Sequence, residues 1–180
     1  MKDINFDFAV KKLLGIEGDY SDHKADSGGK TRYGITEATA RAYGYSGSMK
    51  KLPLELAVEI YYKNYWCKMK LHYIPDSDIS YECFEQYVNT GRRKTIIKQL
   101  QQALNALNKT SKTFPELDED GILGIKTSKA ITKCLSSNPK IKSRILKILN
   151  AHQAIYYLRL TIKRKKDKAF FGGWLDHRIN

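Results

Sequence analysis

The sequence is short of acids and of cysteine. Only 19 of its 180 residues are Asp or Glu, against 32 Lys or Arg, which gives a net charge of +13. This surplus favours an anionic partner, such as nucleic acid, an anionic membrane surface or a bacterial cell wall. The three cysteines, Cys67, Cys83 and Cys134, form no CxxC pair, so neither a disulfide framework nor a structural zinc site is expected. Cys83 and Cys134 are expected in the core.

The sequence also lacks an apolar run long enough to cross a membrane, so no stable membrane insertion is expected. Acids occupy the first residues, where a signal peptide would carry basic and then apolar residues. We therefore expect synthesis in the cytoplasm without a signal peptide, and release by another component if the protein acts outside. Hydrophobic residues make up 42% of the chain, enough for a sizeable core.

Apolar residues recur at helical spacing along most of the chain, which predicts a mainly α fold. Gly91 to Lys94 marks a boundary between a first half, residues 1–91, and a helical second half, residues 92–180. The apolar tail, Phe170 to Leu175, should dock onto the fold. The stretch from Gly18 to Ile35 is too long for a turn and should be an ordered loop with a short β-hairpin. The expected helices span roughly residues 3–17, 36–43, 53–66, 78–89, 96–107, 126–135 and 140–165, with Asp3 and Thr36 as the N-caps of the first two. On the fourth helix, Glu85 is expected beside the buried apolar stripe rather than in it.

Glu17 is the first candidate for chemistry. It follows Val10 and Leu13 at helical spacing and so continues a buried stripe. A carboxyl group at the edge of an apolar face loses solvation, which favours the protonated form that a general acid needs. The alternative is a partly exposed structural acid at a helix end.

Three neighbouring stretches carry a family resemblance. Glu17–Ser21 reads EGDYS, Asp26–Gly29 reads DSGG and Thr31–Thr36 reads TRYGIT. They resemble the EGGYS, DPGG and TNYGIT patterns of the glycoside hydrolase 108 family. These peptidoglycan muramidases include phage endolysins and bacterial "secretion activator" proteins. The sequence departs from the patterns at Asp19, Ser27 and Arg32, and none of these changes removes the acid.

The resemblance extends over nearly the whole chain. The aromatic stretch that ends in Tyr65-Trp66 is similar to a family helix that ends in YW. Phe84–Gly91 resembles the family's FD-x-AVNSG segment, with Glu85 where the family usually has Asp. In the second half, Asp120–Gly124 and Phe171–Leu175 resemble a peptidoglycan-binding module that is usually fused to this catalytic domain.

The resemblance implies a catalytic set. The family's catalytic acid maps onto Glu17. Asp26 is the expected second carboxylate, on a loop that can fold back over the helix end, because glycoside hydrolysis uses two such groups. Thr31 is the expected third member, by similarity to the Glu, Asp, Thr series of phage-type lysozymes, although one residue fewer separates Asp from Thr here.

Tyr20, Tyr33, Trp66 and Asn89 are the expected substrate-binding residues, each with a structural alternative. Tyr33 would otherwise pin the loop, Asn89 would cap a helix, and Trp66 would belong to an aromatic core. Trp174 is expected as a hydrophobic anchor rather than a sugar platform.

No metal site and no cofactor are expected. Asp22, His23 and Asp26 are grouped, but their spacing fits neither an EF-hand nor a zinc signature.

The resemblance therefore implies a lysozyme-like helical domain with a small β-hairpin. It would cleave the β-1,4 bond between N-acetylmuramic acid and N-acetylglucosamine, with peptidoglycan glycan strands as its partner and a holin or other export system for release. The alternative is a non-catalytic basic binder or a secretion helper. The basic clusters come with no helix-turn-helix or zinc motif, so nucleic acid is not an expected partner.

Overall fold

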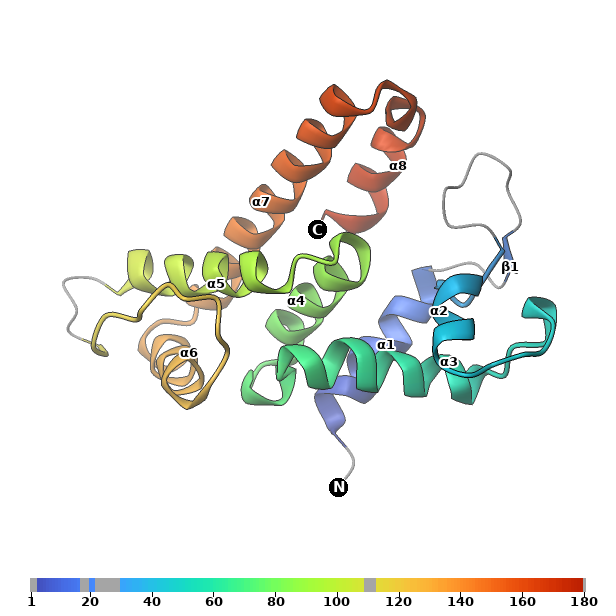
Figure 1. Ribbon diagram of the computed structural model, residues 1–180. Helices are drawn as coiled ribbons and strands as arrows, with labels where there is room; N and C mark the ends of the chain where they lie inside the picture. Colours follow the sequence, from blue (N-terminus) through green and yellow to red (C-terminus); the bar gives the residue numbers. More distant parts are fainter. Residues whose placement is uncertain (1–2, 17–19, 22–29, 109–112, 180) are drawn as a thin grey trace.

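The computed structural model describes residues 3–16, 20–21, 30–108 and 113–179. They form a mainly helical fold with one small antiparallel sheet, as the sequence predicts (Figure 1). The elements outside the sheet are the following: α1 (Ile4–Ile16), α2 (Glu37–Ala42), η1 (Met49–Lys51), α3 (Leu54–Tyr61), η2 (Tyr62–Cys67), η3 (Leu71–Tyr73), α4 (Ser77–Thr90), α5 (Arg93–Leu107), α6 (Ile125–Ser137), α7 (Ile141–Lys163), η5 (Lys165–Asp167) and α8 (Lys168–Arg178).

Helix α4 lies at the centre of the fold and contacts both α1 and α7. It begins where Asp76 Oδ1 accepts the backbone N–H groups of Asp78 and Ile79, and it ends at Gly91, which has a φ of 68°. Every residue from Ile79 to Gln86 is buried, so the helix is covered all round rather than along one stripe. The expectation that Glu85 lies beside the buried stripe is therefore wrong, because its exposed fraction is 3%.

An aromatic cluster joins α1 to α4 and to η2, which is a π-helical segment. The rings of Phe6, Trp66 and Phe84 meet edge to face, with centroids 5.4 to 6.3 Å apart. Trp66 is fully buried, and its Nε1 donates to Asp3 Oδ2 over 2.7 Å. Asp3 Oδ1 also accepts the backbone N–H groups of Asn5 and Phe6, which confirms Asp3 as the N-cap of α1.

The small sheet follows the order β1 (Tyr20–Ser21), β2 (Thr31–Arg32) and β3 (Ile35–Thr36). Strands β2 and β3 form the predicted hairpin, with Arg32 opposite Ile35. The two turn residues, Tyr33 and Gly34, have φ values of 52° and 74°, as a two-residue type I′ turn requires. Thr36 then caps α2, since its Oγ1 accepts the Thr39 N–H.

The second half packs through α7 onto α5, α6 and α4. Helix α8 returns beside α7 towards α4, so the apolar tail docks as predicted, in helical form (Figure 1). The Trp174 ring lies 4.9 Å from the ring of Tyr157 on α7. Cys83 and Cys134 are buried, also as predicted. None of the helices within the described ranges has the length and hydropathy needed to span a membrane.

The Asp120–Gly124 segment is a turn held against α5. Gln101 Nε2 donates to Asp120 Oδ1 over 2.8 Å, and Gly121 N donates to Gln101 Oε1 over 2.9 Å. Gly121 has a φ of 72°, and a Cβ atom added there would lie 2.5 Å from the carbonyl oxygen of Lys94. Glycine is therefore required here for two reasons, the backbone conformation and the close approach of α5.

Replacing Gly121 with Ala should destabilise the fold more than the same change at Gly91. Both glycines have positive φ, which costs about 1 to 2 kcal/mol for an L side chain. A Cβ at Gly91 meets nothing within 4 Å, whereas one at Gly121 meets backbone. Overpacking should add about 1 to 3 kcal/mol at Gly121. Urea unfolding of Gly121→Ala and Gly91→Ala measures the difference, and equal losses would show that the contact with α5 is unimportant.

Candidate active-site cleft

A cleft of about 620 Å³ lies between the end of α1 and the C-terminal helix α8. Gly15 lines one side, two residues before Glu17 in the chain. The α8 side is lined by Ala169, Phe170, Gly173, Trp174, His177 and Arg178. The first and the last helix of the chain thus line one concave surface.

Two of the predicted catalytic residues, Glu17 and Asp26, lie outside the described residues, as does the side chain of Tyr20. Thr31 is described and half-buried in the middle strand of the sheet. Its neighbours across the sheet are Ser21 on β1 and Thr36 on β3. The catalytic set therefore stays a prediction.

Tyr33 is held firmly by its neighbours. Its carbonyl oxygen accepts the hydroxyl of the buried Tyr61 over 2.8 Å, and its own hydroxyl accepts Arg32 Nη2 over 3.1 Å. The Arg32 guanidinium also lies 4.8 Å from the centre of the Tyr33 ring. These contacts fix the hairpin turn to the core, which is the pinning role considered above. Contact of Tyr33 with a sugar stays a prediction.

The structure corrects the expectation for Trp66. The side chain is fully buried in the aromatic cluster, and its only polar atom is bonded to Asp3. A ring that is covered on all sides has no face for a sugar, so Trp66 belongs to the core. The sequence suggested both possibilities because aromatic residues serve equally in cores and in sugar-binding walls.

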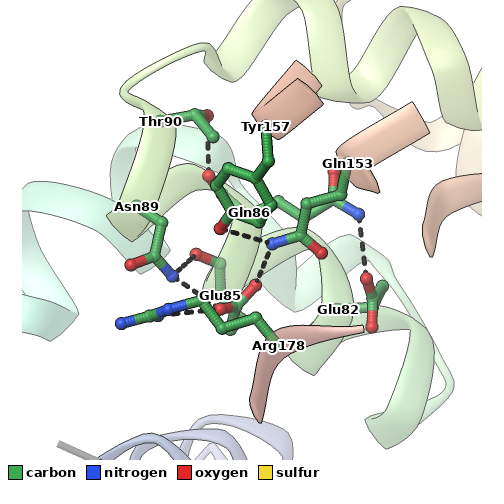
Figure 2. Close-up of polar contacts among 8 residues, drawn as sticks. All are labelled: Glu82, Glu85, Gln86, Asn89, Thr90, Gln153, Tyr157 and Arg178. Atoms are coloured by element: carbon green, nitrogen blue, oxygen red, sulfur yellow. Dashed lines mark hydrogen bonds and ion pairs between the residues drawn. The ribbon is translucent and has the colours of Figure 1, made fainter. Parts of the chain in front are cut away.

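Asn89 belongs to a polar network around the buried carboxylate of Glu85 (Figure 2). Glu85 Oε1 accepts Asn89 Nδ2 over 2.6 Å and Arg178 Nη1 over 3.0 Å, and Oε2 accepts Gln153 Nε2 over 2.7 Å. The Glu85 and Arg178 side chains are 4% and 18% exposed. The network thus joins α4, α7 and α8, and Arg178 also lines the cleft. Contact of Asn89 with substrate stays a prediction.

The sequence reading missed Gln153 and Arg178. A signal existed for Gln153, because it stands four residues after Leu149 and four before Tyr157, in the buried row of α7. A polar residue in such a row needs a buried partner. Arg178 carried no such signal, since its partner is 93 residues away.

Glu82 is a second buried acid on α4. Burial raises the pKa of its carboxyl to about 7, and the nearby negative charge of Glu85 acts in the same direction. Gln86 Nε2 donates to Glu82 Oε1 over 2.8 Å and to the Leu149 carbonyl over 3.0 Å, which partly offsets the loss of solvation. Glu82 does not line the cleft, so its pKa bears on stability rather than on the reaction.

Stability should therefore fall as the pH rises from about 4.5 to 7. The pKa of Glu82 lies above its ordinary 4.5, so the folded state binds the proton more tightly than the unfolded chain in this window. The side chain of Glu82→Gln stays neutral at every pH. Its free energy of unfolding should exceed that of the wild type by up to about 3 kcal/mol at pH 8, with little difference near pH 4.5.

Urea unfolding between pH 4.5 and pH 8 measures this gain. The exposed Glu55→Gln is the matched control and should track the wild type throughout. A gap between Glu82→Gln and wild type that does not change with pH would contradict the assignment.

The described residues also give no support for a metal centre. Among them, no three His, Cys, Asp or Glu side chains are grouped to hold an ion. Asp22, His23 and Asp26 lie outside the described residues.

Comparison with known proteins agrees with this architecture. Residues 10–91 match the family described as glycosyl hydrolase 108, and residues 95–179 match a predicted peptidoglycan domain. The chain is also similar to a solved structure from Brucella abortus, SagA, with 25% identity and a TM-score of 0.64. The similarity covers 97% of this chain and 96% of that one. No curated protein matches the chain.

The lysozyme-like helical fold and the family matches define a glycosyl hydrolase directed at peptidoglycan. Residues 10–91 of the chain thus match the glycosyl hydrolase 108 family, and residues 95–179 match a predicted peptidoglycan domain.

Proposed function

We propose that the protein is an N-acetylmuramidase, which cleaves the β-1,4 bond between N-acetylmuramic acid and N-acetylglucosamine. The observation that carries the proposal is the position of the cleft, which includes Gly15 near the end of α1 within the glycosyl hydrolase match. Glu17 follows two residues later and is the proposed general acid. It protonates the oxygen of the leaving sugar as the glycosidic bond breaks.

Asp26 is the proposed second carboxylate. In glycoside hydrolysis this group either activates a water molecule or attacks the sugar carbon directly. Thr31 is the proposed hydroxyl partner. Its place in the central strand is fixed by pairing on both sides, which gives a rigid support next to β1, the strand that follows the Glu17 segment.

Helix α8 is the proposed wall for the glycan strand. Trp174 and Phe170 both line the cleft, with nearly parallel rings whose centroids are 6.3 Å apart. Aromatic faces offer apolar contact and a π surface to the C–H face of a sugar ring. Trp174 also packs on Tyr157, so the anchoring role expected from the sequence and a sugar-facing role are compatible.

The net charge of the protein supports a cell-wall polymer as the substrate. A net charge of +13 attracts the enzyme to an anionic polymer and raises its local concentration there. We propose that the protein acts on the cell wall after release from the cytoplasm, with a holin or other export system as the releasing partner.

Glu17→Gln should abolish cleavage of purified peptidoglycan while the fold is retained. The substitution keeps the size of the side chain and removes its acidic proton, so the loss should be at least about 100-fold. Borohydride reduction followed by mass measurement should show products of the wild type that are reduced at muramic acid.

Glu55→Gln, at an exposed acid on α3, is the control and should cleave like the wild type. Full activity of Glu17→Gln would refute the acid assignment. Products reduced at glucosamine would refute the proposed bond, and no cleavage by the wild type would favour a binding role.

A further inference from the structure

A second concave surface lies away from the cleft, between the start of α5 and the second half of α7. It has a volume of about 440 Å³, and none of the described residues that line it also lines the cleft. We call it the α5–α7 groove, defined by Arg92, Thr95, His152, Tyr156, Arg159 and Lys163 among its lining residues. All of its described lining residues belong to the second half of the chain.

The groove is strongly cationic. Arg92, Arg159 and Lys163 are exposed, and no acid is among the described residues that line it. In the part of the chain that the structure describes, none of the three takes part in an ion pair. Three unneutralised cations around one hollow create a site for a negatively charged group.

Arg92 is held in place for such a role. Its guanidinium lies 5.2 Å from the centre of the Tyr156 ring, a cation–π arrangement across the groove between the start of α5 and α7. A stacked guanidinium keeps its N–H groups free at the edge and can bind both oxygens of a carboxylate. Arg159 lines the same groove three residues after Tyr156.

The groove also offers apolar surface. Ile155 and Ile162, both on α7, are 46% and 69% exposed and line it together with Leu160. Large exposed aliphatic side chains beside unpaired arginines suit a ligand that carries both carboxylates and small alkyl groups. A uniformly charged polymer would make no use of the isoleucines.

We propose that the α5–α7 groove binds the peptide stems of peptidoglycan through their free carboxylates. The proposal rests on the proposed function, since it takes peptidoglycan as the substrate, and it separates two tasks. The cleft beside α1 takes the glycan strand, and the groove takes the peptide that the strand carries. Stem peptides combine free carboxylates with alanine methyl groups, which matches the cations and the isoleucines of the groove.

Calorimetric titration with a soluble stem pentapeptide tests the proposal. The probe is the peptide with free carboxylates, compared with the same peptide fully amidated. Wild type should bind the free peptide and lose that affinity by about tenfold or more on amidation, because charge-assisted hydrogen bonds are removed. Arg92→Gln/Arg159→Gln should lose a similar factor for the free peptide.

Lys129→Gln/Lys133→Gln is the matched control, because it removes the same charge from exposed positions on α6. It should keep the affinity of the wild type to within about twofold, since distant surface charges are largely screened. Equal losses in the two double variants, equal binding of the amidated peptide, or no saturable binding would each overturn the proposal. The comparison of the free and the amidated peptide uses only the wild-type protein, so it does not depend on whether a variant folds.

Cleavage of peptide-free glycan strands by the wild type is measured separately. That reaction reports on the proposed function alone, and peptide binding reports on the groove alone. A failure of the proposed function can therefore be distinguished from a failure of the proposal for the groove.

Discussion

The burial of one carboxylate, that of Glu85, constrains the rest of the structure. A charged group so far from water is stable only if its oxygens are fully paired. Its partners, Asn89, Gln153 and Arg178, come from α4, α7 and α8. Loss of α7 or α8 would take Gln153 or Arg178 away from this buried carboxylate. The network therefore favours a fold in which the last helix of the chain lies against the central one.

This constraint has a consequence for the site. Arg178 is part of both the Glu85 network and the lining of the cleft. By holding Arg178, Glu85 also positions the cleft face of α8, which carries Trp174. The wall opposite Gly15 is thus supplied by the segment that matches the predicted peptidoglycan domain, not by the glycosyl hydrolase segment. Two further contacts tie the segments together: Gln86 Nε2 bonds the Leu149 carbonyl, and Lys142 pairs with Asp78.

Local features of the fold were predictable from the sequence. The caps at Asp3 and Thr36 and the β2–β3 hairpin depend on residues within a few positions of one another, and the structure confirms them. Helical periodicity likewise identified the buried stripes of most helices. Such signals are local, so they do not depend on which elements meet in the fold.

The features that were missed depend on distant contacts. The prediction of one apolar stripe on α4 assumed one buried face, whereas α1 and α7 both pack on the helix, and Glu82 and Glu85 are buried as well. Trp66 was open to two interpretations until its burial was seen. Gly172 and Gly173 in the tail disfavour a helix by local propensity. Packing on α7 and the ion pair between Arg178 and Glu85 nevertheless stabilise α8 there.

A double-mutant cycle between Glu85 and Arg178 tests this account most directly. The free energy of unfolding would be measured in urea for wild type, Glu85→Gln, Arg178→Gln and the double variant. Arg178→Gln should cost about 3 to 5 kcal/mol, because it leaves the carboxylate buried without its counter-ion. The double variant should be more stable than the sum of the single losses predicts, by about 2 kcal/mol. Additive losses would contradict the claim that this ion pair holds the C-terminal helix on the central one.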